Sequence, residues 1–278
     1  MGTPGPPDRA PLVEWERITA GPGPWTPLDT RSGHYAYLVE AGRIRMEIGG
    51  TVHEAGPEGL LWAGSGVLRR LHWGADDPAT GWVVRIRNRT LGLTSDADLV
   101  ALHALLRLGR LGERVGALPC RPATVAMLRA RLVASPAPAG PMAQKALLFD
   151  LLDALLADPD LVRALEGLGG RRSPSAALVR AIQHMEAHAH EPLSVPGLAR
   201  MAGLSRSQFH RRFREVMPAT PHAYLRRLRV GRAARLLGET DRTVLDVSLA
   251  CGFGSVSRLY DAFHRVLGRP PGQMRRPE

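Results

Sequence analysis

The chain has 278 residues, enough for one large domain or two ordinary ones, and 44% of them are hydrophobic while 23% are charged. No uncharged apolar run reaches about 18 residues, and residues 1–11 lack the basic and apolar regions of a secretion signal, so we expect a cytoplasmic protein with no membrane partner. The formal net charge of +11 lies entirely in residues 171–278, which hold 19 arginines, no lysine and 8 acidic residues. Positive charge confined to one region indicates a polyanionic partner such as nucleic acid.

The N-terminal half contains short strand-like segments. Residues 1–30 are rich in proline and glycine, and we expect a flexible arm there. Residues 35–39 alternate, and residues 44–53 hold two alternating runs separated by two glycines, which predicts a β-hairpin. Further short strands are predicted over 60–62, 67–73 and 82–86. Closely spaced short strands are typical of a small β-barrel or sandwich.

From about Asp96 the pattern becomes helical. Helices are predicted over 96–108, 123–133 and 142–156. The third carries a wide leucine stripe that either packs onto the strands or pairs with a second subunit; we expect a mixture, and hence a homodimer. The Gly- and Ser-rich residues 167–175 predict a linker between a domain over 31–166 and a C-terminal domain over 176–278.

The C-terminal domain is predicted to be entirely helical, and one pattern occurs in it twice. Ser194 caps a short helix, Gly203 lies in a turn, and Ser205 caps a second helix. After a longer helix, Gly252 and Ser255 repeat the turn and the cap. The predicted helices span 175–188, 195–202, 206–216, 221–238, 243–251 and 256–267. A helix, a tight turn with glycine and a second helix are typical of helix-turn-helix units, whose second helix we call the reading helix.

Each reading helix has one apolar face. Phe209 and Phe213 are four residues apart, as are Leu259 and Phe263, so we expect these pairs to be buried. The polar side chains then face outward, where arginine can bond guanine in the major groove. A solvated basic face is the alternative, but the charge distribution and the repeated turns favour DNA. The candidate DNA-binding residues are Arg206, Ser207, His210, Arg211, Arg214, Ser257, Arg258 and Asp261.

A family resemblance is carried by residues 198–205, 209–213, 221–227, 250–253, 255, 263, 268 and 271. Over this third of the chain the sequence resembles the DNA-binding domain of the AraC/XylS family of transcription regulators. The resemblance implies that the two reading helices enter successive major grooves of double-stranded operator or promoter DNA, about 34 Å apart. It implies base contacts by Ser207, His210, Arg211, Ser257, Arg258 and Asp261, and it makes RNA polymerase a candidate partner. Asp261 could accept a hydrogen bond from cytosine or repel phosphate, so base contacts by the second reading helix stay open.

Members of this family often carry an N-terminal cupin-like barrel that binds a small effector, followed by helices that dimerise. The layout here is similar, which implies an α+β fold: a small cupin-like β-barrel with following helices, and an all-α domain with two helix-turn-helix units. An effector pocket would lie in the barrel mouth. Its candidate residues are Tyr37, Arg45, Trp62, Arg69, His72, Trp82 and Arg85. Equally, the tryptophans could be core and the arginines solvated.

No metal, cofactor or enzymatic activity is expected. His34, His53 and His72 are isolated in the sequence, and Cys120 and Cys251 lack a cluster of metal ligands. An enzymatic alternative is a barrel-based isomerase or oxygenase that also binds DNA, or a repair protein that accepts an alkyl group on a cysteine; the missing histidine cluster, the lack of a convincing nucleophile–base pair and the absence of ligand partners beside Cys120 argue against it. A further alternative is a nonspecific architectural DNA-binding protein, whose affinity would depend on salt and little on sequence.

Overall fold

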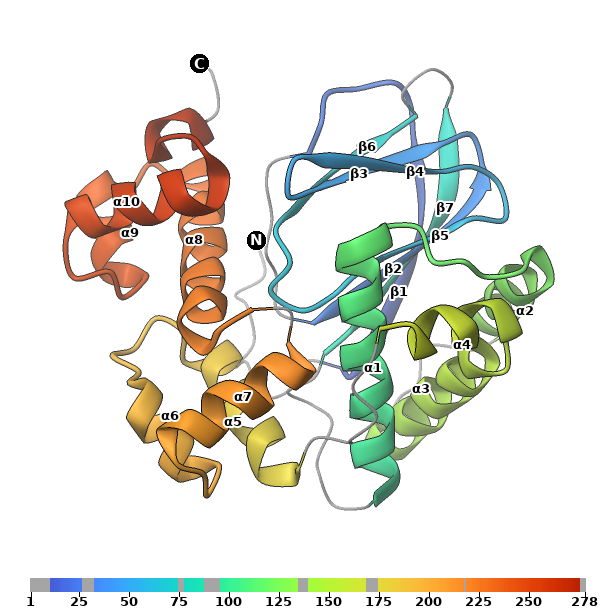
Figure 1. Ribbon diagram of the computed structural model, residues 1–278. Helices are drawn as coiled ribbons and strands as arrows, with labels where there is room; N and C mark the ends of the chain where they lie inside the picture. Colours follow the sequence, from blue (N-terminus) through green and yellow to red (C-terminus); the bar gives the residue numbers. More distant parts are fainter. Residues whose placement is uncertain are drawn as a thin grey trace.

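The computed structural model of the chain describes residues 11–26, 33–74, 78–87, 96–134, 140–168, 175–217 and 219–275. Figure 1 shows strands and helices of the N-terminal part on the right and a helical C-terminal part on the left. The predicted linker over 167–175 lies mostly outside the described residues. Among the described helices, none is long and apolar enough to cross a membrane.

The strands form two antiparallel sheets. The larger sheet has the order β1-β7-β2-β5 and the smaller has the order β4-β3-β6. Their bounds are β1 (Val13–Ala20), β2 (His34–Ala41), β3 (Ile44–Ile48), β4 (Thr51–Ala55), β5 (Leu60–Ala63), β6 (Arg69–Trp73) and β7 (Ala79–Ile86). Within the described residues no strand pairing joins the sheets, so the prediction of a closed barrel is wrong. Alternation of side chains is the same in a barrel and in two facing sheets, which is why the sequence pattern did not separate them.

Strand β1 lies inside the segment that was predicted as a flexible arm, so that prediction is wrong for residues 13–20. The strand pairs along its whole length with β7, from Val13 opposite Ile86 to Ala20 opposite Ala79. It is an edge strand with several half-exposed or exposed side chains on both faces, so its polar alternation is weak. Prolines precede and follow this segment in the sequence, and for this reason the sequence pattern indicated a flexible arm instead of a strand.

The predicted hairpin is confirmed between β3 and β4. Gly49 and Gly50 form its turn with φ values of 58° and 84°, the left-handed conformation that tight two-residue turns require. The facing sides of the two sheets enclose a core that includes Tyr37, Met46 and Trp73. The hairpin therefore places the smaller sheet over one face of the larger one.

Helices cover the other face of the larger sheet. They are α1 (Asp96–Val115), α2 (Pro122–Ala134), α3 (Pro141–Leu156) and α4 (Pro159–Glu166). The leucine stripe of α3 points inward, with Leu148, Leu151 and Leu152 at most 5% exposed beside apolar side chains of β2, β5 and β7. Helix α1 crosses β5 so closely that a Cβ on Gly112 would lie 2.3 Å from the Trp62 carbonyl oxygen, which explains a glycine inside this helix.

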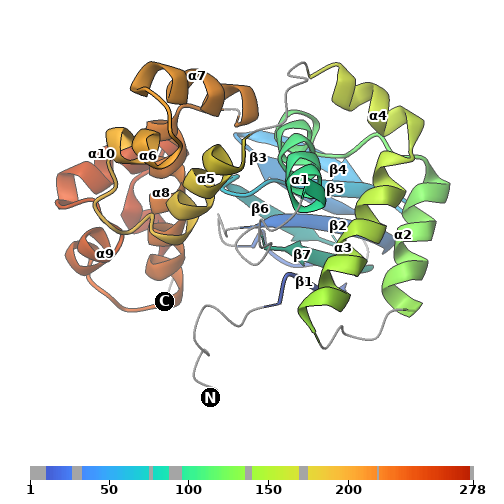
Figure 2. The same cartoon turned by 90° about the horizontal axis from the view of Figure 1, so that it is seen from below.

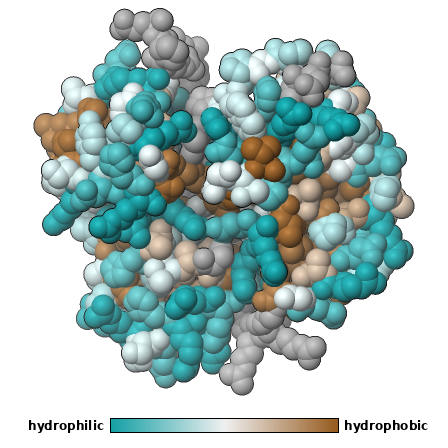
Figure 3. Space-filling view, turned by 45° about the horizontal axis from the view of Figure 1, so that its top comes forward, coloured by the Kyte–Doolittle hydropathy of each residue, from teal (hydrophilic) through white to brown (hydrophobic). Residues whose placement is uncertain are grey.

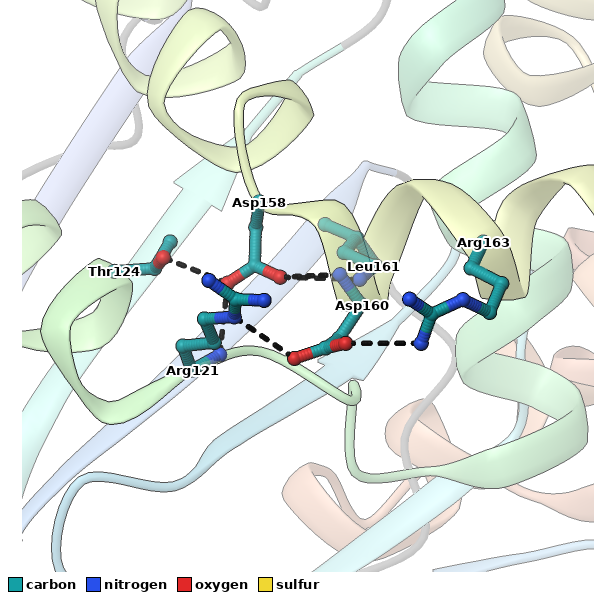
Figure 4. A network of polar contacts seen from close by, with 6 residues as sticks. All are labelled: Arg121, Thr124, Asp158, Asp160, Leu161 and Arg163. Carbon is teal, nitrogen blue, oxygen red and sulfur yellow. Dashed lines mark hydrogen bonds and ion pairs between the residues drawn. The ribbon is translucent and has the colours of Figure 1, made fainter.

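Helix α4, which was not predicted, begins at a buried aspartate. One carboxylate oxygen of Asp158 accepts hydrogen bonds from the amides of Asp160 and Leu161, at 3.0 and 3.1 Å. The other accepts from the Thr124 hydroxyl at 2.6 Å and the Arg121 amide at 2.7 Å (Figure 4). Burial alone would raise the pKa of Asp158, but these hydrogen bonds outweigh burial and the pKa is lowered. Asp158 thus ties the start of α2 to the start of α4.

The C-terminal part is helical, as predicted. Its elements are α5 (Ala176–Ala187), α6 (Val195–Met201), α7 (Arg206–Val216), α8 (Pro221–Glu239), α9 (Val244–Ala250), α10 (Val256–Leu267) and a short 3-10 helix, η3 (Pro271–Met274). In Figures 1 and 2, α1 lies between these helices and the α2–α3 pair. Polar contacts join α1 to the C-terminal part: Arg227 and Glu113 form an ion pair at 2.6 Å, and Arg110 donates to the Glu215 carbonyl at 2.7 Å.

Candidate nucleic-acid interface

Helices α6 and α7 form the first helix-turn-helix unit, and local interactions fix its turn. Gly203 has a φ of 65°, a left-handed conformation that glycine adopts without strain. The Ser205 hydroxyl accepts from the Gln208 amide, and the Gln208 side chain accepts from the Ser205 amide at 3.0 Å. This capping box determines where α7 begins, and therefore which side chains its first turn presents.

The predicted facing of α7 is confirmed for Phe209 and Phe213 and for its exposed arginines, but not for His210, which was expected to face outward. Phe209 and Phe213 are fully buried with ring centroids 5.7 Å apart, and Phe213 packs edge-on against Tyr224 of α8. The His210 ring is half-buried and its centroid lies 6.2 Å from that of His222 on α8. The exposed candidates on this helix are Arg206, Ser207, Arg211 and Arg214. All four are available to a partner that approaches the outer side of α7.

Helices α9 and α10 form the second unit with the same construction. Gly252 has a φ of 76°, and a Cβ there would lie 2.4 Å from the His190 carbonyl oxygen, so the turn requires glycine. The Ser255 hydroxyl accepts from the Arg258 amide at 3.3 Å and caps α10. The two units thus begin their reading helices by the same local chemistry.

The facing of α10 also agrees with prediction. Leu259 and Phe263 are fully buried in a core shared with α8 and α9. The predicted contact residues Ser257, Arg258 and Asp261 are exposed. Tyr260 is 38% exposed, so it lies at the surface rather than within the core.

Helix α8 separates the two units. Pro221 occupies its first turn, and the Thr220 hydroxyl caps it by accepting from the Ala223 amide at 3.2 Å. Its first half contributes Leu225 to the core around α7, and its second half contributes Leu237 to the core around α10. On the face shown in Figure 3, hydrophilic side chains cover most of this C-terminal part. One rigid helix therefore carries two reading helices on separate cores.

The seven predicted effector-binding residues do not form one site. Three of them lie together between the two sheets, around the ring of Tyr35. Arg69 is 3% exposed, donates to the Tyr37 hydroxyl at 2.9 Å and stacks over the Tyr35 ring at 4.1 Å. Arg85 lies over the same ring at 5.2 Å. Its guanidinium is also 3.4 Å from the Glu14 carboxylate.

The other four predicted effector residues face elsewhere. Arg45 and His72 are opposite each other on the outer side of the smaller sheet, where Arg45 pairs with Glu54 at 2.7 Å. Trp62 and Trp82 lie on the helix-facing side of the larger sheet and pack against the core there. The prediction that all seven line one pocket is therefore wrong, because alternate residues of a strand point to opposite faces.

Neither cysteine is in an activating environment. Burial raises the pKa of Cys120 to about 12, with a further contribution from Asp158, and burial raises the pKa of Cys251 to about 11. In the part of the chain that the structure describes, no three His, Cys, Asp or Glu side chains are grouped so that they could hold a metal ion.

Comparisons with known proteins match the C-terminal part in sequence and nearly the whole chain in fold. The profile of a helix-turn-helix domain matches residues 198–277. The chain is 39% identical over 98 residues to the transcriptional regulator CdhR of Pseudomonas aeruginosa, covering 35% of this chain and 29% of CdhR. It is 32% identical over 134 residues to the transcriptional activator RhaS of an Enterobacter species, covering 48% of this chain and 46% of RhaS. The matched regions thus span less than half of these relatives.

One solved structure shares the fold over nearly the whole chain. ToxT from Vibrio cholerae superposes with a TM-score of 0.52 at 9% identity, covering 94% of this chain and 96% of ToxT. A second structure of ToxT, with a TM-score of 0.50 at 10% identity, covers 94% of this chain and 97% of that chain and contains a naphthalenyl butenoic acid. At this identity the likeness shows the arrangement of the elements and nothing about their chemistry.

Proposed function

The chain belongs to the AraC family of transcription regulators through its C-terminal helix-turn-helix domain, and from this premise we propose that it binds a specific DNA sequence with both reading helices. The observation that carries the proposal is the facing of α7 and α10. Helix α7 buries two phenylalanines completely, and α10 buries a leucine and a phenylalanine in the same way. Each helix exposes polar side chains along its other side. Exposed arginines on these helices, among them Arg206, Arg211 and Arg258, are available to neutralise phosphates.

The roles of individual residues follow from their side-chain chemistry. Arg211 is exposed and can donate two hydrogen bonds to guanine in the major groove. Ser207 and His210 flank it on the same side of α7. Helix α10 has its capping serine 50 residues after that of α7, so Ser257 corresponds to Ser207 and Asp261 to Arg211. Asp261 would accept from the amino group of cytosine, and Arg258, one turn before it, would donate to a base or a phosphate. Arg206 and Arg214 at the ends of α7 would contact the DNA backbone.

Selection of bound sequences from a random DNA pool tests this proposal. We expect two short conserved blocks about one helical turn apart, bound about a thousandfold more tightly than random DNA at physiological salt. Equal affinity for selected and random DNA, both with and without added cell extract, would instead indicate an architectural DNA-binding protein. Enrichment only with extract would indicate that a small effector is required.

We further propose that the N-terminal part controls DNA binding through an effector held between the two sheets. Arg69, Arg85 and the tyrosines around them would bind an aromatic or acidic small molecule, since guanidinium groups pair with carboxylates and rings stack. A structure of ToxT, which shares the fold at 10% identity, contains an aromatic acid, and this makes small aromatic acids the first compounds to test. Thermal shift assays with small organic acids test it: a compound that stabilises the protein should lose its effect in Arg69→Met.

A homodimer is the second part of this proposal. Five of the six leucines of α3 are buried within the chain, so a second subunit would contact other apolar side chains on α2 and α3. Val133 and Met142 are 64% and 78% exposed there. Analytical ultracentrifugation should show a dimer that weakens in Val133→Glu and Met142→Glu; a monomer at all concentrations would contradict it.

A further inference from the structure

A basic groove lies between the two helix-turn-helix units, and most of the residues that line it are not among the predicted reading residues. The groove has a volume of about 260 Å³ and runs between α8 and α10. A water molecule occupies about 30 Å³ in the liquid, so the groove has room for a phosphate group together with its hydration. Its polar lining consists of His222, Arg226, Arg229, Arg258, Asp261 and Arg265.

The charges of the lining favour an anion. Four arginines face one carboxylate, that of Asp261. Arg229 donates to the carbonyls of Ala189 and Glu191 at 2.6 and 2.7 Å, so it forms a fixed wall of the groove. Arg226 is half-exposed and Arg265 is exposed. These last two guanidinium groups are available to a ligand that enters from solvent.

The groove is continuous with the outer face of α7. His222 and Arg226 are four residues apart on α8 and share one face of that helix. The His222 ring is 6.2 Å from the ring of His210 on α7. Burial lowers the pKa of His222, and the charges of His210, Arg206 and Arg226 lower it further. One side of α8 therefore connects the outward faces of both reading helices.

We propose that this side of α8 binds the DNA backbone between the two major grooves, with Arg226 and Arg265 holding phosphates. The inference rests on the proposed function, because two reading helices in successive grooves leave one stretch of backbone to pass in front of the helix that separates them. Guanidinium groups bind phosphate oxygens with two hydrogen bonds each. Asp261 lies on the same groove and directs the phosphates toward Arg226 and Arg265 by repulsion.

The test is the salt dependence of binding to a random-sequence duplex by Arg226→Gln, Arg265→Gln and a control, Arg235→Gln. Arg235 is nine residues from Arg226, about half a turn around α8, and does not line the groove. Affinity falls with salt, and each lost phosphate contact should make the plot of log affinity against log salt less steep by about 0.9. This corresponds to about a fivefold loss of affinity at about 0.15 M salt. We expect this reduction in both groove variants and a much smaller one in the control.

A second measurement uses the selected DNA sequence. A neutral methylphosphonate placed between the two conserved blocks should weaken binding by the wild-type protein and have little further effect on Arg226→Gln.

Unchanged salt slopes in both groove variants would overturn the proposal and point to an acidic protein as the occupant of the groove. An equal reduction in the control would overturn it too, because net charge alone would then explain the effect. The first measurement uses random DNA, so it gives a result even if the protein reads no specific sequence. A failure of the proposed sequence-specific binding would therefore be distinguished from a failure of this inference.

Discussion

The Tyr224 hydroxyl donates a hydrogen bond to the Glu186 carboxylate at 2.6 Å, and the Ser65 hydroxyl donates to the same oxygen at 2.6 Å. Tyr224 belongs to α8, Glu186 to α5 and Ser65 to the segment after β5. All three are buried, and a Cβ on Gly66 would lie 2.7 Å from the Tyr224 ring. Buried hydrogen bonds and close packing thus connect the N-terminal part to α8, the helix that separates the two reading helices.

The first prediction concerns this contact. Burial and the charge of Glu186 raise the pKa of Tyr224 well above its ordinary value, so the phenol is a protonated donor at neutral pH. Tyr224→Phe removes a hydrogen bond to a buried carboxylate and should lower the free energy of unfolding by about 2 kcal/mol, measured by urea denaturation. Tyr260→Phe removes an exposed hydroxyl and should change it little. Equal effects of the two substitutions would show that the buried contact contributes nothing.

The core of the first unit gives a second prediction. Phe209 is fully buried between α7 and its neighbours, so Phe209→Ala removes a large apolar side chain and leaves a cavity. We expect a loss of about 3–5 kcal/mol in the free energy of unfolding. Arg211→Ala, on the exposed side of the same helix, is the matched control and should leave stability within about 0.5 kcal/mol. A stable Phe209→Ala protein would contradict the facing of α7.

The third prediction separates base contacts from backbone contacts. Arg211→Ala should weaken binding to the selected sequence by about 1–3 kcal/mol and binding to random DNA much less, because a base contact discriminates between sequences. Electrophoretic mobility shifts with both duplexes measure the difference. Equal losses on the two duplexes would remove Arg211 from the base-reading residues.

The reading helices could be predicted because their signals are local. The capping box of Ser205 and Gln208 and the glycine turn at Gly203 act within a few residues, so sequence spacing alone places the start of α7. The spacing of Phe209 and Phe213 then determines which side of the helix is exposed. None of these features depends on the rest of the molecule.

The N-terminal site could not be predicted in the same way. Strand alternation shows that Tyr35 and Tyr37 share a face, but it does not say whether that face meets the second sheet or the helices. The candidate pocket therefore combined residues of three different surfaces. The contact of Ser65 with Glu186 joins residues 121 apart in sequence, and no local pattern marks it.

Asp158 gives a fourth prediction, which depends on pH. Its pKa is lowered in the folded chain, so its contribution to stability is present above the ordinary carboxyl pKa and is lost as the pH falls through the lowered value. Asp158→Asn should cost about 2 kcal/mol at neutral pH, because the amide cannot accept from all four donors. The difference from wild type should shrink in acid denaturation below about pH 4. Asp160→Asn, whose side chain is 38% exposed, is the control and should show little of either effect.

The last prediction concerns the two thiols and bears on the enzymatic alternative. A repair protein that accepts an alkyl group needs a thiolate, and thiolate content falls as the pKa of the thiol rises. With a pKa of about 12, only about one Cys120 in ten thousand is ionised at about pH 8. Cys251 is fully buried and its pKa is also raised, to about 11. Iodoacetamide should therefore label both cysteines slowly in the native protein and rapidly after unfolding in guanidinium chloride, as measured by mass spectrometry. Rapid labelling of native Cys120 would show an activated thiol and would support a role for this residue as an alkyl acceptor.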